Sequence, residues 1–185
     1  VYGWRRVLRD CGRYLAPLST ALAQLRALRH KFQHDWGAEA LVPPCPYVHG
    51  VPAVLLHCTM HSYRAADKLT DEWRKLLGVT TVRHQQHVAV EIKNMEPKHP
   101  IMQGFGESWK TPAGELYEIV KVWPHTTVLG QAHGVRTKKD HPCIWVNQYG
   151  KARVFGTTIG HHNETMETEA YLGYLTRGLL WACGK

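Results

Sequence analysis

The feature that most limits the fold is a short apolar run just after residue 50. Val51 and Ala53–Leu56 are all apolar, and only Pro52 interrupts them. A strand without alternation of apolar and polar residues is typical of a position covered on both faces, as in parallel sheets. The run therefore predicts a central parallel strand and a sheet that carries helices.

A helix is predicted after this strand. Leu69, Trp73, Leu76 and Leu77 recur at the spacing of one helical face, and Gly78 stands where a left-handed C-terminal cap is expected. A closing helix is predicted over 164–183, which has acidic residues in its first turns and Arg177 nearer its end. Further strands follow from apolar alternation, and the last two flank a hairpin at Gly150–Ala152. These predicted strands are 87–92, 115–122, 126–129, 142–149 and 153–159.

Residues 1–50 differ in character from the rest. Leucines at helical spacing predict a helix over 19–33, and four prolines within the stretch 42–52 predict a connector that cannot be helical. We therefore divide the chain into a divergent segment, 1–50, which we interpret as a truncated or mis-framed start, and a domain over 51–185.

Composition excludes several functional classes. The net charge of +8 is spread along the chain and not clustered, which favours a solvated basic surface over a nucleic-acid site. No apolar run is long enough for a membrane span and no signal peptide is recognisable, so the chain as given is expected to be soluble. The five cysteines contain no C-x-x-C pair and predict neither a disulfide framework nor a zinc finger.

Histidine is the unusual component. The chain has 13 histidines, ten of them after residue 50. Imidazole is both a metal ligand and a proton-transfer group near neutral pH, so these positions are the first candidates for a site.

A series of short motifs runs from Val51 onward. They are LLHCTMHSYR at 55–64, Trp73 with LLGV at 76–79, His84, HPIMQGF at 99–105, ELY at 115–117, HPCIWVNQYGKARVFGTTIGHH at 141–162 and RGLLWACG at 177–184. Each motif is weak alone, but the seven in this order over 51–184 resemble the ThuA-like (trehalose-utilisation) family, which is related to class I glutamine amidotransferases.

The resemblance implies a flavodoxin-like fold with three layers, a mostly parallel sheet between helices, here with an antiparallel hairpin. Two departures stand out. Ala152 replaces a glycine of the family's hairpin, so a left-handed backbone would be strained there. Residues 1–50 do not resemble the βαβ opening of the family, which is therefore divergent or missing.

Candidate site residues lie where strands are expected to end, since ligands of doubly wound folds bind outside the carboxyl ends of parallel strands. His57 ends the first strand, and His84 and His161 are expected to converge on it. The resemblance places Glu115 and Tyr117 at the same rim. The predicted catalytic residues are His57, His84, Glu115 and His161, and the predicted substrate-binding residues are His61, Arg64, Tyr117, Lys151 and Arg153.

Two kinds of chemistry suit this set. Neutral imidazoles with a carboxylate can bind zinc or a similar divalent metal, for which His57, His84 and His161 are the predicted ligands. The alternative is an amidotransferase-like hydrolase with Cys58 as nucleophile and His162 and Glu164 as base and orienting acid. Cys58 has no glycine close by, which a nucleophile elbow would need, and this disfavours the alternative.

By resemblance, the expected function is in the catabolism of trehalose or a related, oxidised sugar, through proton transfer or metal-assisted chemistry. A non-catalytic sugar-binding or interaction module on the same fold is the other candidate. The expected ligand is a small sugar, and no nucleotide cofactor, nucleic acid or membrane span is predicted. The reaction type, the compartment and the oligomeric state stay open.

Overall fold

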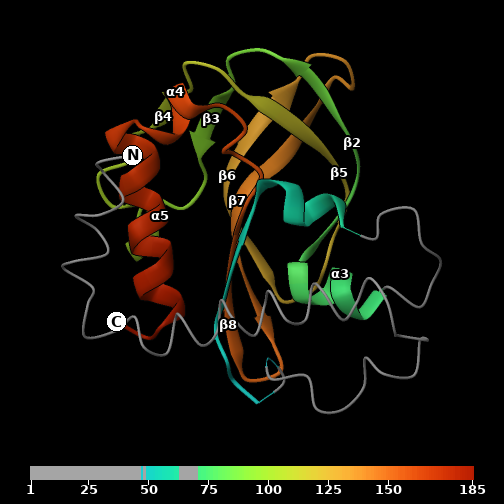
Figure 1. Ribbon diagram of the computed structural model, residues 1–185, viewed down its shortest axis with the longest axis vertical. Helices are drawn as coiled ribbons and strands as arrows, with labels where there is room; N and C mark the ends of the chain where they lie inside the picture. The colour runs from blue at the N-terminus through green and yellow to red at the C-terminus, as the bar shows by residue number, and fades with distance from the viewer. Residues whose placement is uncertain (1–46, 48, 63–70) are drawn as a thin grey trace. The chain divides into compact units, whose positions relative to one another are not determined.

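The computed structural model describes residues 47, 49–62 and 71–185, all of which belong to one compact unit, Pro44–Lys185 (Figure 1). The predicted helix over 19–33, most of the predicted 1–50 segment, and the positions of Arg64 and Leu69 lie outside the described residues. No helix in the described part of the chain has both the length and the apolar character needed to cross a bilayer.

The main sheet has six strands in the order β1-β8-β7-β6-β3-β4. The run that predicted a buried strand forms β1, which pairs in parallel with β8. All other pairs in this sheet are antiparallel, so the expectation of a mostly parallel sheet is wrong for the described strands. The expectation of a central position for β1 is also wrong, because β1 stands at the end of the strand order. The strands are β1 (Ala53–Leu56), β3 (Glu91–Asn94), β4 (Ser108–Lys110), β6 (Thr126–Gly134), β7 (Lys139–Tyr149) and β8 (Ala152–Thr157).

Two further strands, β2 (Val79–His87) and β5 (Glu115–Val122), form an antiparallel pair of their own. The prediction of a strand over 115–122 is confirmed. The strand predicted over 87–92 is wrong, because β2 ends at His87 and β3 begins only at Glu91. His84 lies inside β2, since the β-branched residues that follow Gly78 extend the chain at once.

The helices largely follow the sequence pattern. Helix α3 (Asp71–Leu77) ends at Gly78, which has a φ of +82° and whose amide donates a hydrogen bond to the Arg74 carbonyl oxygen. Gly78 thus forms the predicted left-handed cap. The predicted closing helix is two helices, α4 (Asn163–Met166) and α5 (Glu169–Ala182), because the Thr168 hydroxyl caps a new helix by accepting the Tyr171 amide. Two short 3-10 turns, η2 (His57–His61) and η4 (Pro100–Met102), complete the elements.

The sheet lies between α5 and α3, as Figure 1 shows. Phe155 of β8 packs so closely on α5 that a methyl group at Gly178 would lie 2.6 Å from its ring. On the neighbouring strand β7, Trp145 stands beside Gly156 and donates its indole N–H to the Leu77 carbonyl of α3. Because consecutive residues of a strand point to opposite faces, Phe155 and Gly156 mark the two sides. The layers are therefore α5, sheet and α3, and the expected three-layer α/β class is confirmed.

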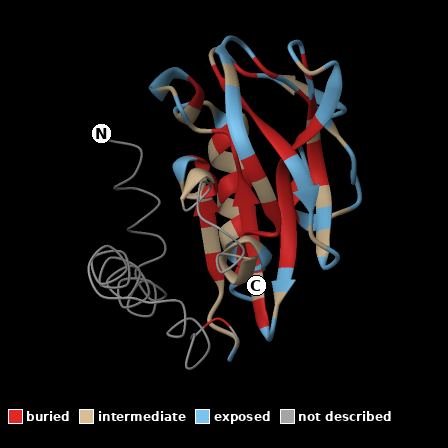
Figure 2. Ribbon diagram, turned by 90° about the vertical axis from the view of Figure 1, so that its right-hand side faces the viewer, coloured by how far each residue is buried: buried red, intermediate tan, exposed pale blue. Residues whose placement is uncertain are grey.

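Burial follows the same layers (Figure 2). The core lies mainly between the sheet and α5 and includes Ile144, Phe155, Ile159, Tyr171 and Tyr174, each at most 1% exposed. Burial of apolar surface of this kind supplies most of the favourable free energy of folding.

The hairpin between β7 and β8 is confirmed, with Tyr149 paired to Ala152 around a two-residue turn. The left-handed position in this turn is Gly150, with a φ of +57°. Ala152 is a buried residue of β8 outside the left-handed region, so the strain expected there is absent.

Candidate functional site

The candidate site lies where β1 and β8 end. Because the two strands run in parallel, their carboxyl ends reach the same edge, and the segments that follow begin with His57 and lead to His161. The His57 Nε2 and His161 Nδ1 atoms lie 3.0 Å apart, although 104 positions separate the residues. The structure therefore brings these two predicted site residues into direct contact.

A buried carboxylate joins them. Glu115, on β5, is 5% exposed, and its Oε2 lies 3.2 Å from His57 Nε2 and 3.5 Å from His161 Nδ1. Its Oε1 lies 2.8 Å from His84 Nδ1 and 3.0 Å from His87 Nε2. Four imidazoles from three parts of the chain thus surround one carboxylate; we call these five residues the Glu115 cluster.

An irregularity in β2 makes room for two of these histidines. His84 pairs with Tyr117 and His87 with Glu115, so three positions on β2 match two on β5. In a regular strand, residues three apart point to opposite faces. The extra residue of the bulge restores a common direction, and both imidazoles reach Glu115.

The proton position on His84 follows from its contacts. The Nδ1 atom lies 3.0 Å from the Gln85 carbonyl oxygen and 2.8 Å from Glu115 Oε1, and both are acceptors. The Nδ1 atom therefore carries a hydrogen and donates it. His84 therefore orients the carboxylate from outside.

His57 combines burial with an unusual backbone. Its φ of +41° is in the left-handed region, which is uncommon for a residue other than glycine and is concentrated at functional sites. The pKa of His57 is lowered from 6.5 to about 4, chiefly by burial and also by the neighbouring His161 and His61, against the opposing effects of Glu115 and the Thr158 backbone. His57 is therefore neutral at neutral pH.

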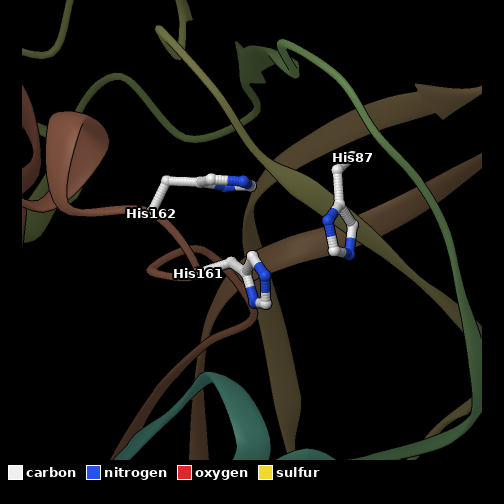
Figure 3. A group of neighbouring side chains, drawn as sticks. All are labelled: His87, His161 and His162. Atoms are coloured by element: carbon white, nitrogen blue, oxygen red, sulfur yellow. The ribbon is translucent and has the colours of Figure 1, made fainter.

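Three groups of side chains in the described part of the chain have donor atoms close enough to share a metal. They are His57 with Glu115 and His161, His84 with His87 and Glu115, and His87 with His161 and His162. Figure 3 shows the last group, in which the three rings point toward one another from β2 and from the segment after β8. His87, His161 and Glu115 each belong to two groups, so the whole set forms one continuous site.

An aromatic pair forms one wall. The His61 ring, from η2, stacks on Tyr117 with centroids 3.9 Å apart and planes inclined by 8°. Tyr117 is buried and also lies 5.0 Å from the His57 ring. The structure thus places two of the five predicted substrate-binding residues, His61 and Tyr117, beside the Glu115 cluster.

The structure does not bring Lys151 and Arg153 to this site. Both lie at the β7–β8 hairpin, and Arg153 is four positions before Thr157 on β8, about 13 Å along an extended strand. The Arg153 guanidinium stacks over the Trp181 ring at 3.9 Å instead. Cys58 is exposed and belongs to none of the three donor groups, and Glu164 is an exposed residue of the first turn of α4.

Sequence reasoning missed His87, and it assigned His162 only to the amidotransferase alternative. The spacing of His84 and His87 was a usable signal, but on a regular strand it predicts opposite faces. For His162, the usable signal was that it is adjacent to His161 in the sequence, which the His162–Glu164 pattern does not use. His162 sits at the N-cap of α4 without capping it, and its ring lies 4.5 Å from His161 and 5.5 Å from His87.

Known structures share this fold. A ThuA-like protein from Parabacteroides merdae superposes with a TM-score of 0.64 at 18% identity, over 75% of this chain and 63% of that one. A ThuA-like protein from Bacteroides uniformis gives a TM-score of 0.59 at 18% identity, over 75% of this chain and 61% of that one. A cytoplasmic protein from Salmonella typhimurium gives 0.59 at 12% identity, over 84% and 65%.

These likenesses show the fold alone, and the chain spans less than two thirds of the length of each of these relatives. No curated protein matches the chain in sequence. The family match is direct, however: residues 48–182 match the ThuA family, described as trehalose utilisation. This match covers well over half of the 185 residues, and the chain therefore belongs to the ThuA family.

Proposed function

We propose that the Glu115 cluster is the catalytic site of an enzyme of carbohydrate catabolism that moves protons on a sugar or an oxidised sugar. The observation that carries the proposal is the buried Glu115 carboxylate surrounded by four imidazoles. A carboxylate in a poorly solvated position is a suitable general base, and imidazoles beside it can deliver or accept a second proton. The family description, trehalose utilisation, supports a sugar as the substrate class.

An oxidised sugar suits this arrangement better than an intact one. A keto group makes the hydrogen on the neighbouring carbon acidic, so a carboxylate can remove it. As the electrons move to the carbonyl oxygen, an imidazole N–H donates a proton to that oxygen, which gives a neutral enediol. His84, with its Nδ1 hydrogen held between two acceptors, keeps the carboxylate oriented for the first transfer.

The stacked pair of His61 and Tyr117 supports a ring-shaped ligand. Aromatic faces next to polar groups are frequent where proteins contact the apolar face of a sugar ring. The half-buried His61 lies over the buried Tyr117, so His61 is the member that a sugar would meet.

The test is proton exchange in heavy water. We expect the full chain, incubated with 3-keto-glucosides in deuterium oxide, to introduce deuterium beside the keto group, followed by NMR. His161→Ala should lower the exchange rate by about 10²–10⁴-fold, whereas Lys151→Ala, at the distant hairpin, should retain it.

Calorimetry with trehalose and the same keto-sugars completes the test. Binding without exchange or turnover by the unaltered protein would contradict the enzyme and would support a non-catalytic sugar-binding module. Full exchange by a folded His161→Ala protein would remove His161 from the site.

A further inference from the structure

Three donor atoms of the Glu115 cluster form a compact triangle. His57 Nε2 lies 3.0 Å from His161 Nδ1 and 3.2 Å from Glu115 Oε2, and the latter two lie 3.5 Å apart. The same three atoms make all three contacts. They come from the end of β1, from β5 and from the segment after β8, so elements of the fold hold each corner.

This triangle has the dimensions of one face of a metal coordination polyhedron. Zinc lies about 2.0–2.1 Å from imidazole nitrogen and carboxylate oxygen, which separates tetrahedral ligands by about 3.4 Å and neighbouring octahedral ligands by about 3.0 Å. The three observed separations fall at these values. A single cation could therefore contact all three atoms after shifts of a few tenths of an ångström.

Charge favours a cation at this point. Among the described residues, the ionic partners of the buried Glu115 carboxylate are all imidazoles, with no lysine or arginine. Without a metal, one hydrogen on His57 Nε2 would have to serve both His161 Nδ1 and Glu115 Oε2. A divalent ion would satisfy the three atoms together and balance the carboxylate, which a buried charge requires.

The other two donor groups are less suitable. In the group with His84 and His87, the His84 Nδ1 atom also lies 3.0 Å from the Gln85 carbonyl oxygen, an acceptor that is not a member of the group and that competes with a metal for this atom. The group with His87, His161 and His162 has its ring centroids 4.4–5.5 Å apart and no carboxylate. We propose that His57 Nε2, His161 Nδ1 and Glu115 Oε2 form a binding site for one divalent transition metal, such as zinc.

This ligand set differs from the one expected from sequence, because Glu115 replaces His84. Two nitrogens and one carboxylate oxygen suit zinc or another first-row metal and disfavour calcium and magnesium, which prefer oxygen ligands. Three protein ligands on one face leave coordination positions open, where the metal could polarise a carbonyl oxygen. With Glu115 Oε2 on the metal, removal of a proton from the sugar would fall to Glu115 Oε1, which lies outside the triangle. The inference rests on the proposed function for this use, whereas the metal site itself rests on the geometry.

The test is metal binding alone. The full chain, stripped with a chelator, is titrated with Zn²⁺ by calorimetry and with Co²⁺ by visible absorption, which reports the ligand geometry. We expect about one equivalent to bind the unaltered protein. His57→Gln and His161→Gln should each weaken binding by at least about 100-fold, since each removes a direct ligand.

Two further variants make the assignment specific. His162→Gln removes an imidazole of the rival group and should leave Zn²⁺ affinity within about threefold, as should the matched control His133→Gln, whose exposed ring pairs with Asp140. His84→Gln should retain binding, weakened by no more than the about 10–100-fold typical of groups that only orient a ligand.

Absence of Zn²⁺ and Co²⁺ binding by the unaltered protein would overturn the proposal. Loss of binding in His162→Gln with retention in His57→Gln would overturn it in favour of the three-histidine group. Sugar exchange without metal binding would defeat this inference and leave the proposed function standing. Metal binding without any sugar turnover would support this inference and contradict the proposed function.

Discussion

Strand β8 has polar side chains at both ends, and the two ends use them in contrasting ways. Beyond its carboxyl end, His161 joins three other imidazoles around the single buried carboxylate of Glu115. At its amino end, Arg153 lies 3.9 Å over the Trp181 ring, and His99 lies 5.7 Å from the same ring. Both ends belong to the motif run that resembles the ThuA family, and both contributed to the predicted site.

The two ends differ in whether their polar groups are already satisfied by partners within the protein. At the amino end, the guanidinium is covered by an indole, and His99 Nδ1 accepts the Ile101 amide to cap η4. At the carboxyl end, several donors and acceptors converge on the same few atoms, so not all of them can be satisfied by one another. The polar groups at the carboxyl end would gain hydrogen bonds or ligand bonds from a bound ligand, whereas those at the amino end already have partners.

The largest expected effect would come from removing the shared carboxylate. Glu115→Gln keeps the shape but loses the base and the charge, so we expect deuterium exchange to fall by about 10²–10⁴-fold and Zn²⁺ binding to be lost. Arg153→Ala, at the other end of β8, should change neither. The measurements are NMR exchange rates and calorimetry. Retained exchange in Glu115→Gln, or lost exchange in Arg153→Ala, would break the contrast between the two ends.

A smaller effect should appear in stability as the pH falls. The pKa of His57 is lowered by burial from 6.5 to about 4 in the folded protein, so the unfolded chain binds the extra proton first. This contribution to stability is complete above pH 6.5 and is lost as the pH falls toward about 4. Urea unfolding of the metal-free protein at several pH values in this range should show a free energy of unfolding that decreases as the pH falls, and His57→Gln should make this decrease smaller. An equal decrease in His57→Gln would mean that His57 is solvated in the folded state.

The smallest effect concerns the amino end. Arg153→Ala removes the stacking on Trp181 and should cost about 0.5–1 kcal/mol, measured by urea unfolding, whereas Lys151→Ala on the exposed turn should have almost no effect. The pKa of His99 is lowered mainly by burial and further by the Arg153 charge, so it should rise in Arg153→Ala. NMR titration of His99 checks this shift. A His99 pKa that stays unchanged in Arg153→Ala would show that the Arg153 charge does not act on this imidazole.

Much of the fold was predictable because it depends on local patterns. Alternation located β5 and the β7–β8 hairpin, helical spacing located α3, and Gly78 ended that helix as expected. Errors arose at the ends of elements: the Thr168 cap divided the last helix, and β2 ended at His87, where a strand had been expected to begin. The position of β1 in the sheet was also beyond local pattern, because strand order depends on contacts between distant segments.

By itself, the sequence determined the family, the class of fold and the supply of histidines, since each of these is written in composition, spacing and the order of motifs. Which imidazoles share Glu115 could be read only from the folded chain. That choice depends on the parallel pairing of β1 with β8 and on a one-residue bulge that turns His84 and His87 to the same side. The physical reason is that side-chain direction alternates along a strand, so a single inserted residue reverses it while leaving the sequence pattern almost unchanged.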